Sequence, residues 1–106
     1  MTTQQRPDDS EISPRFREIT EEVLFGDVWE RPILSPRARS IVVLSALTAQ
    51  YRGDQLKRHI RRGLKNGLTK EEMGEIWLQL AFYSGWPVVA NAMGMAREVF
   101  AEQHSD

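Results

Sequence analysis

Apolar residues recur at intervals of three and four along most of the chain, the spacing that places them on one face of an α-helix. In the middle of the sequence Leu56, Ile60 and Leu64 follow at i, i+4 and i+8, and basic side chains occupy the other side. No stretch alternates apolar and polar residues for long enough to form a strand. The pattern predicts an all-α fold, a single compact bundle of about five helices. The other helical runs follow Pro14, Pro36, Thr69 and Pro87.

Helix boundaries are marked by small polar residues, glycine and proline. A serine or threonine before a run caps exposed backbone amides, and Thr69 with Glu72 has the spacing of a reciprocal capping box. Glycine permits the left-handed conformation that often ends a helix, and proline disfavours helical geometry at the residue before it. The sequence predicts starts at Ser13-Pro14, Ser35-Pro36, Asp54 and Thr69, and ends at Gly26, Arg52-Gly53, Asn66-Gly67 and Gly85-Trp86-Pro87.

A length of 106 residues fits one domain with a modest core. Residues 1–12 carry almost nothing apolar, so we expect a disordered polar tail there and a helical domain over residues 13–103. The apolar runs are far shorter than the ~20 residues that span a bilayer, and the first residues lack the apolar segment of a signal peptide. We therefore expect a cytoplasmic protein with no membrane partner. The chain has no cysteine, which excludes thiol and disulfide chemistry.

The net charge of −1 argues against nucleic acid as the main partner. Arginine nevertheless outnumbers lysine 11 to 3, and basic residues crowd the segment 52–65. One interpretation is a solvated helix face with ion pairs to acidic neighbours. The other is that one or two arginines grip a carboxylate or phosphate with their planar fork, which would make a small anionic molecule the partner.

Two of the predicted helices carry more apolar side chains than one small core needs. The helix after Pro36 is apolar nearly all round, so we expect it to be buried on most sides. The last helix has small residues at positions 90, 92, 94 and 96, which let another helix approach closely. Such a surplus is typical of a subunit interface, and we expect a homo-oligomer.

His59 is the principal candidate for chemistry, because the other histidine, His104, lies in a polar C-terminal stretch. It falls at the border between the apolar stripe of its helix and the basic face. One interpretation is a histidine at the edge of the core whose ring is satisfied by a backbone carbonyl. The other is a general acid or base, since histidine titrates near neutral pH and an apolar wall can tune its pKa.

Other chemistries find little support in the sequence. One central histidine and scattered carboxylates give no metal-ligand spacing, and there is neither a glycine-rich phosphate loop nor a serine elbow motif. Glu75 and Gln79 form a polar stripe that faces solvent or lines a pocket shared with His59. Large aromatic residues are expected in the core or at an interface, where the Tyr83 hydroxyl would need a partner. They are Trp29, Trp77, Phe82, Tyr83 and Trp86.

Three stretches of the sequence occur in a recognisable order. They are Phe25–Leu34 (FGDVWERPIL) with Arg37-x-Arg39-Ser40, His59–Gly67 (HIRRGLKNG) with Thr69-x-Glu71-Glu72-x-x-Glu75, and Tyr83–Pro87 (YSGWP) with Asn91-Ala92. Together they resemble the carboxymuconolactone decarboxylase family, over roughly residues 16–100. The resemblance implies the all-helical fold of alkyl hydroperoxidase D-like proteins, assembled as trimers or hexamers.

The peroxidase branch of that superfamily works through a Cys-x-x-Cys-x-x-x-His motif. If His59 aligns with the histidine of this motif, Arg52 and Gln55 occupy the cysteine positions. No thiolate is then available for redox chemistry. The resemblance therefore implies the decarboxylase branch, which also lacks these cysteines.

The family's decarboxylation needs no cofactor, because the unsaturated lactone substrate itself accepts the electrons that departing carbon dioxide leaves behind. The protein must hold an anionic substrate, stabilise an enolate oxygen and deliver a proton to carbon. The resemblance assigns substrate binding to Arg37 or Arg39, with Trp29, Gln79 and Trp86 as further contacts. It makes His59 the candidate for proton transfer, Glu75 its orienting partner and Tyr83 the donor to the oxyanion.

Three functions are compatible with this sequence. The first is a cofactor-independent lyase that decarboxylates a small carboxylated lactone, as in aromatic catabolism. The second is an isomerase, cyclase or lyase of the same fold with a different unsaturated substrate in a biosynthetic pathway. It stays open because the short polar stretch Thr2–Ser13 replaces a longer N-terminal region of the archetypal enzymes. The third is a non-catalytic oligomeric binding protein, which a solvent-facing or fully packed His59 would favour.

Overall fold

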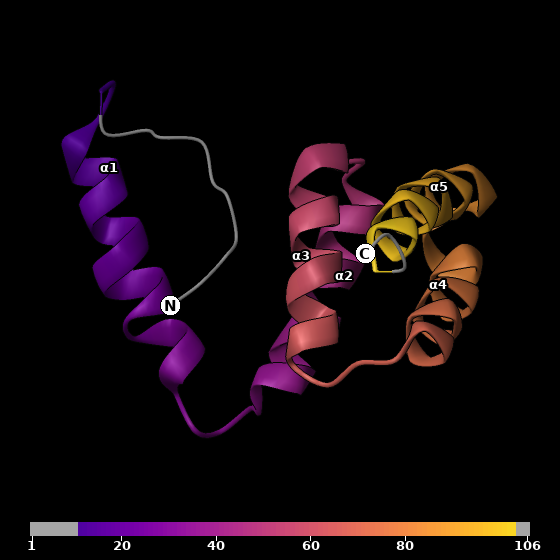
Figure 1. The fold of residues 1–106 in the computed structure, drawn as a ribbon, viewed down its shortest axis with the longest axis horizontal. Helices are drawn as coiled ribbons and strands as arrows, with labels where there is room; N and C mark the ends of the chain where they lie inside the picture. The colour runs from indigo at the N-terminus through magenta and orange to yellow at the C-terminus, as the bar shows by residue number, and fades with distance from the viewer. Residues whose placement is uncertain (1–10, 104–106) are drawn as a thin grey trace.

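The computed structural model describes residues 11–103, which form helices and turns without strands (Figure 1). The all-α prediction of about five helices is confirmed, and the first helix continues as a π-helix before it ends at Gly26. The predicted tail lies outside the described residues except for its last two positions. In chain order the elements are α1 (Pro14–Ile19), η1 (Thr20–Phe25), η2 (Val28–Glu30), α2 (Pro36–Ala49), α3 (Gly53–Lys65), α4 (Lys70–Ser84) and α5 (Trp86–Glu102).

Helices α2 to α5 pack together as a bundle, whereas α1 and η1 stand apart from it. In the bundle α2 contacts the other three helices, and α5 contacts both α3 and α4. The indigo helix at the left of Figure 1 is α1 continued by η1, and its principal contacts with the rest of the chain run through η2. We call residues 14–30 the N-terminal arm. None of the described helices is long and apolar enough to cross a membrane.

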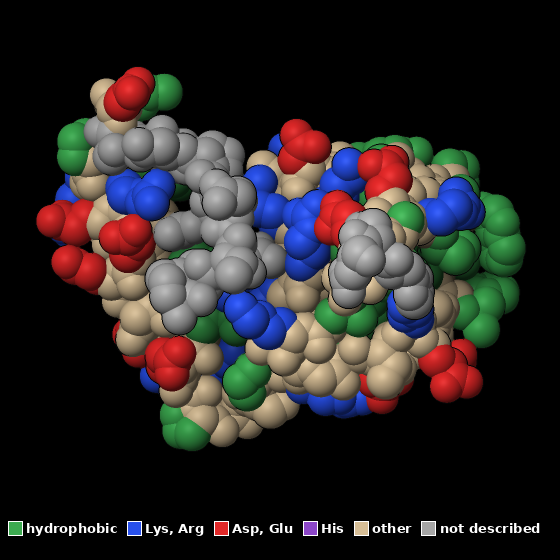
Figure 2. All heavy atoms as spheres, viewed as in Figure 1, with side chains coloured by type: hydrophobic (Ala, Val, Ile, Leu, Met, Phe, Trp, Pro, Cys, Tyr) green, Lys and Arg blue, Asp and Glu red, His purple; other side chains and the backbone are tan. Residues whose placement is uncertain are grey.

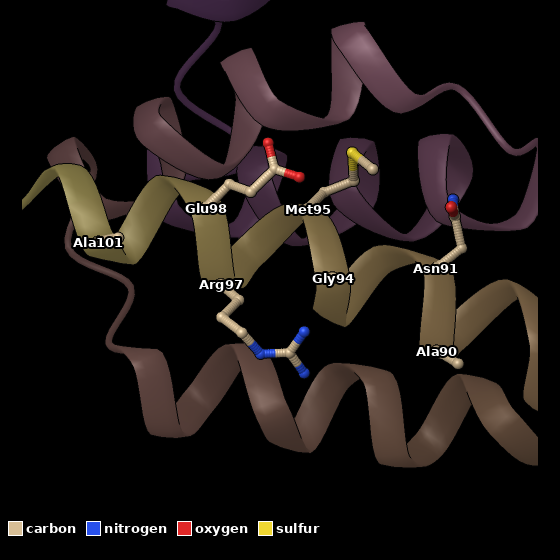
Figure 3. Close-up of a pocket in the computed structure, with 7 residues that line it drawn as sticks. All are labelled: Ala90, Asn91, Gly94, Met95, Arg97, Glu98 and Ala101. Atoms are coloured by element: carbon tan, nitrogen blue, oxygen red, sulfur yellow. The ribbon is translucent and has the colours of Figure 1, made fainter.

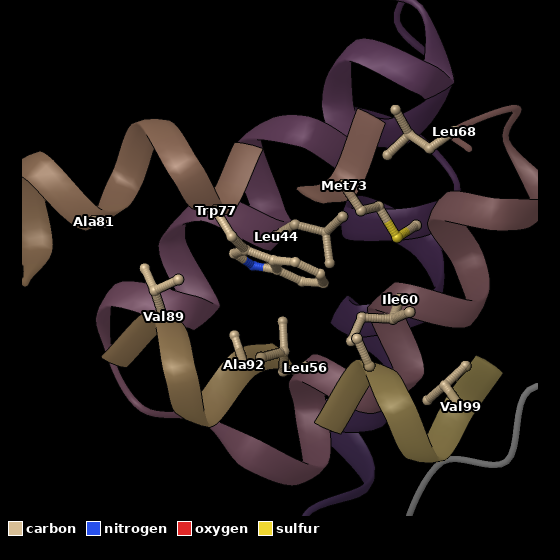
Figure 4. Close-up of a cluster of buried hydrophobic side chains, with 11 residues drawn as sticks. Leu44, Leu56, Ile60, Leu68, Met73, Trp77, Ala81, Val89, Ala92 and Val99 are labelled. Carbon is tan, nitrogen blue, oxygen red and sulfur yellow. The ribbon is translucent and has the colours of Figure 1, made fainter. Parts of the chain in front are cut away.

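The hydrophobic core lies entirely within the bundle. Each of its four helices supplies buried side chains, Leu68 adds one from the turn before α4, and the arm contributes none. Trp77 lies among the aliphatic side chains of the other helices (Figure 4). The fold therefore places the arm outside the unit that carries the core. The core residues are Leu44, Leu56, Ile60, Leu68, Met73, Trp77, Ala81, Val89, Ala92, Ala96 and Val99.

Helix α2 is buried along one stripe only, which differs from the expectation of burial on most sides. Its fully buried residues are Ser40, Leu44 and Thr48, while Val42 keeps 57% of its surface exposed. The two hydroxyl groups tolerate burial because both are hydrogen-bonded. Asn66 Nδ2 donates to Ser40 Oγ at 3.0 Å, and the Trp77 indole donates to Thr48 Oγ1 at 3.0 Å.

The predicted caps are confirmed where the signal is local. The hydroxyls of Ser13 and Ser35 each accept a hydrogen bond from the amide three residues ahead, and Thr69 and Glu72 form both bonds of the capping box. Gly67 follows Asn66, the C-cap of α3, and Gly85 lies between α4 and α5; both have φ of +102°. The capping bonds of Ser13, Ser35 and Thr69 satisfy amide groups that the first turn of a helix leaves unpaired.

The predicted cap at Asp54 is wrong. Helix α3 begins two residues earlier than a cap at Asp54 would place it, at Gly53, and its N-cap is Arg52, which makes no side-chain capping bond. The chain leaves α2 through Tyr51 in a left-handed conformation, with φ of 62°, and the Arg52 amide donates to the Leu47 carbonyl. This tight exit starts the next helix early, so Asp54 lies in its first turn, where a negative charge favours the helix dipole.

The buried hydrogen bond between α2 and α4 leads to a stability prediction. Thr48→Val keeps the shape of the side chain but leaves the Trp77 indole N–H without its acceptor, so we expect a loss of ~1–3 kcal/mol in the free energy of unfolding. Ser45→Ala is the matched control on the same helix, since that hydroxyl donates only to the Ile41 carbonyl of its own helix. Urea unfolding followed by circular dichroism measures both, and equal losses would contradict the assignment.

Candidate functional site

Side chains of the arm and of α3 meet in a set of stacked rings. Phe25 of η1 stacks on Trp29 of η2, with ring centroids 6.3 Å apart and planes at 18°. Trp29 stacks on His59 of α3 at 6.2 Å and 19°. Arg62, one turn after His59, places its guanidinium carbon 4.7 Å from the Phe25 centroid and 5.6 Å from that of Trp29. We call these four residues the ring stack; it joins the arm to α3 through aromatic and cation–π contacts.

His59 is half-buried in the ring stack, and its Nδ1 atom has no hydrogen-bond partner among residues 11–103. That nitrogen therefore lacks the carbonyl partner that a purely structural histidine at the core edge would use. Burial, together with the positive charges of Arg62 and Arg58, lowers the pKa of the imidazole from 6.5 to about 4. The ring is consequently neutral near pH 7. Basic side chains gather over α3, in the middle of Figure 2.

A pocket of about 180 Å³ opens between the arm and α2, and Trp29 is part of its wall. Its lining is mainly apolar, and Arg39 is the one cation among the lining residues. The Arg39 guanidinium donates from Nη2 to the Arg31 carbonyl at 2.9 Å, while its Nε is buried without a partner in the described part of the chain. The pocket can therefore offer a charged donor to an anionic ligand. The lining residues are Leu24, Val28, Trp29, Leu34, Arg39, Val42 and Val43.

His59 contacts Trp29 but is not itself one of the residues that line the pocket. The indole is thus shared between the two halves of the candidate site. It gives one wall to the pocket and one ring contact to the imidazole. The distance between a ligand in the pocket and His59 depends on where this indole lies.

Arg37 and Arg39 were equivalent candidates in the sequence, and the structure places them differently. Arg37 forms an ion pair with Glu72 of α4 and so ties α2 to α4. Glu72 also accepts a hydrogen bond from the Thr69 backbone amide, and this bond, together with the Arg37 charge, lowers the pKa of its carboxyl group. Arg39 is the arginine of this pair that lines the pocket.

The remaining predicted site residues lie on α4 and at the start of α5, away from the ring stack. In Figure 1 these helices occupy the side of the bundle opposite the arm. Glu75 and Gln79 are exposed, as are Tyr83 at 80% and Trp86 at 65%. Trp86 packs edge-on against Phe82, with centroids 6.3 Å apart. Within one chain the structure therefore brings together His59, Trp29 and Arg39, but not these four residues.

Two members of the ring stack, Phe25 and Arg62, were missed as functional candidates. Arg62 follows His59 at i+3, which places both on one face of α3. That spacing was the available signal, although the crowd of basic residues in this segment obscured it. The contact of Phe25 depends on how the arm folds back, which the sequence pattern does not specify.

A second, more open pocket of about 460 Å³ lies along α5 and does not include any residue of the ring stack (Figure 3). Two of the small residues predicted to allow close helix approach, Ala90 and Gly94, line it, together with Ala101 further along the helix. The described residues contain no group of three or more histidine, aspartate or glutamate side chains that could hold a metal ion. The candidate chemistry is therefore concentrated around Trp29.

The pKa of His59 predicts a pH dependence of stability. The folded-state pKa of about 4 lies below the unfolded value of 6.5, so the unfolded chain binds more protons between these pH values. The contribution of the neutral His59 ring to the free energy of unfolding is complete above pH 6.5 and is lost as the pH falls toward 4. We expect the free energy of unfolding, measured with urea, to fall less between pH 7 and 4.5 for His59→Gln than for the wild type. An NMR titration of the histidine signal missing from His59→Gln, with a midpoint near 6.5, would contradict this.

The sequence of this chain is similar to those of several known proteins. The chain is 37% identical over 93 residues to a 4-carboxymuconolactone decarboxylase of Acinetobacter baylyi, which covers 88% of this chain and 69% of that protein. It is 30% identical over 87 residues to an uncharacterized 15.0 kDa protein in the nqo9-nqo10 intergenic region of Paracoccus denitrificans, covering 80% of this chain and 65% of that protein.

A third relative is the nitrosuccinic acid decarboxylase npaB of Metarhizium robertsii, 35% identical over 77 residues, with 73% of this chain and 54% of that protein covered. The chain thus spans between about half and two thirds of the length of these relatives. The sequence pattern of the carboxymuconolactone decarboxylase family matches residues 14–98, a range that contains the arm, the ring stack and the pocket. This chain therefore belongs to the carboxymuconolactone decarboxylase family.

Proposed function

We propose that the protein is a cofactor-independent decarboxylase of a small carboxylated molecule. The observation that carries the proposal is the pocket at Trp29, where the Arg39 cation stands in an apolar lining and the neutral His59 contacts the same indole. Two relatives named as decarboxylases, for two different acids, support a carbon–carbon lyase. The pocket is smaller than the roughly 300–1,000 Å³ of sites for drug-sized ligands, which favours a small substrate.

The two acids in the relatives' names can lose carbon dioxide by the same route. Each is a small molecule that carries a carboxyl group together with an electron-accepting group, an unsaturated lactone in one and a nitro group in the other. When the carbon–carbon bond breaks, carbon dioxide leaves, and the electron pair of that bond moves into the accepting group. A proton added to the resulting anion completes the reaction. Because the substrate holds its own electron acceptor, the protein needs to supply only binding, orientation and a proton.

In the proposed reaction Arg39 binds a carboxylate and His59 transfers the proton. The buried Arg39 Nε has a hydrogen to donate, and a charge-assisted bond to a carboxylate would occupy it. An anionic substrate would offset the charges of Arg58 and Arg62, which lower the pKa of His59 in the free protein. The pKa would then rise on binding, so that the imidazole can carry the proton that it delivers to carbon and later regain one from water.

We favour a carboxylated lactone as the substrate, since the relative with the higher identity and coverage is named for one. A small nitro acid is the second candidate, favoured by the Metarhizium relative. The roles of Glu75, Gln79, Tyr83 and Trp86 require a second copy of the chain, because these residues lie away from the ring stack of their own chain. We therefore also propose a homo-oligomer, a trimer or hexamer, in which the exposed apolar side chains of α4 and α5, green at the right of Figure 2, are covered.

The direct test incubates the protein with carboxymuconolactone, and in parallel with nitrosuccinic acid, and follows carbon dioxide release and ultraviolet absorbance. We expect turnover of at least one acid, and His59→Gln to lower it by about 10²–10⁴-fold. Turnover of neither acid would overturn the proposal and favour a binding protein. A His59→Gln variant within about threefold of the wild type would overturn the role of the histidine.

The proposed role of Arg39 in substrate binding is tested separately, through the KM. Arg39→Met removes a charged donor worth ~1.5–3 kcal/mol, which corresponds to a roughly 10- to 100-fold rise in KM. Arg97→Met is the matched control, because Arg97 is an exposed arginine on α5 away from this pocket. Equal effects of the two substitutions on KM would exclude Arg39 as the carboxylate contact.

Association is tested by light scattering at micromolar concentration. We expect the mass of a trimer or hexamer, and Trp86→Ser, which removes an apolar side chain that is 65% exposed, to shift the protein toward smaller species. His59→Gln serves as a control that should leave the mass unchanged. A monomeric mass for the wild type would be incompatible with the proposed assembly.

A further inference from the structure

We infer that Arg62 is a positioning residue for the site, which holds the Phe25–Trp29 pair against α3 and so keeps the indole stacked on His59. The inference rests on the proposed function only for its effect on turnover. The contact itself is a property of the structure and can be measured without a substrate.

The arm needs such a contact because, among residues 11–103, it packs only lightly on the bundle. It contributes no buried residue, and its main contacts beyond itself are those of η2 with α2. A helix of this length is marginal in water without tertiary packing. The position of the arm is therefore set at its C-terminal end, where the ring stack lies. Its apolar side chains remain at least 41% exposed at Phe16, Ile19, Val23 and Leu24.

The basic residues of α3 divide between two sides of that helix, and Arg62 is directed to the arm. Lys57 pairs with Glu98 at 2.6 Å, and Arg61 donates to both carboxylate oxygens of Glu102 at 2.9 and 2.8 Å. Both of these acidic residues belong to α5, on the bundle side. Arg62 instead lies within 4.7 and 5.6 Å of two ring centroids of the arm.

The planar guanidinium suits this contact better than an ammonium group would. It can lie across ring faces and combine stacking with the attraction between a cation and the π electrons. A single guanidinium here reaches both Phe25 and Trp29, so it holds the two rings of the arm in one place relative to α3. Lysine would keep the charge but lose the planar contact.

Displacement of the arm would alter both halves of the candidate site at once. Leu24, Val28 and Trp29 are arm residues that line the pocket, and Trp29 is also the ring stacked on His59. Arg62 is not among the residues that line the pocket. Its effect on a ligand would pass through the indole, which makes it a positioning residue and not a catalytic one.

The experiment compares Arg62→Met with Arg58→Met and Arg62→Lys. Both Met variants remove one positive charge next to His59, but Arg58 makes no contact with the rings in the described structure. The first readout is the NMR chemical shift of the His59 ring protons above pH 7, where the ring is neutral; stacking on an indole displaces it from the free-imidazole value. The signal is assigned by its loss in His59→Gln.

We expect Arg62→Met to move the His59 signal toward the free-imidazole position and to lower turnover at least tenfold. Arg58→Met should keep the signal in place, and any change in its turnover reports the loss of charge alone; Arg62→Lys should lie between wild type and Arg62→Met in both readouts. An unmoved signal in Arg62→Met, or an equal displacement in Arg58→Met, would overturn the inference.

Phe25→Leu provides a second variant if Arg62→Met does not fold. It removes the ring beneath the guanidinium at a position outside the core, and we expect the same displacement of the His59 signal. An unmoved signal here would also overturn the inference. If the wild type turns over neither acid, the proposed function fails, while the NMR result still decides whether Arg62 positions the rings.

Discussion

The stacking of Trp29 on His59 holds the N-terminal arm against α3, and both halves of the candidate site depend on that contact. The indole supplies part of the wall that faces a ligand and, at the same time, packs against the imidazole. Aromatic pairs of this kind contribute ~0.5–1.5 kcal/mol beyond the area they bury. A site built on so small an energy is held much less firmly than a core of eleven buried side chains. Segments with few buried contacts are also the ones that open locally at low cost in free energy.

The basic segment of α3 serves structure on one side and the candidate site on the other. The interpretation as ion pairs to acidic neighbours is confirmed for Lys57 and Arg61, which pair with residues of α5. Exposed pairs of this type contribute little to stability, so their main effect is to direct these side chains away from the arm. The positive charges of Arg62 and Arg58, on the side of His59, add to burial in keeping the imidazole neutral. Helix α3 thus supplies the neutral imidazole of His59 and the cationic groups of Arg58 and Arg62 within one turn of each other.

The sequence predicted those features that depend on neighbours along the chain. The caps at Ser13, Ser35 and Thr69 involve residues three positions apart, so local spacing was sufficient. Burial of the Thr48 hydroxyl depends on an indole from another helix, which no spacing rule contains. The same limit applies to the site: His59 was identified from its own helix and from the family resemblance, but its ring contacts come from the arm. The roles of Glu75, Gln79, Tyr83 and Trp86 remain predictions, because one chain alone does not bring them to the ring stack.

The separation of the arm from the core has a consequence for how such a protein changes over evolutionary time. Substitutions at contacts that share no partner have nearly additive effects on stability. The residues that line the pocket belong to the arm, to Leu34 after it and to α2, whereas the core is made by the inner faces of the four bundle helices and by Leu68. Substitutions that reshape the wall therefore leave the folding energy of the bundle almost untouched. A protein built in this way can change the shape of its pocket through substitutions in the arm, at little risk to the fold of the bundle.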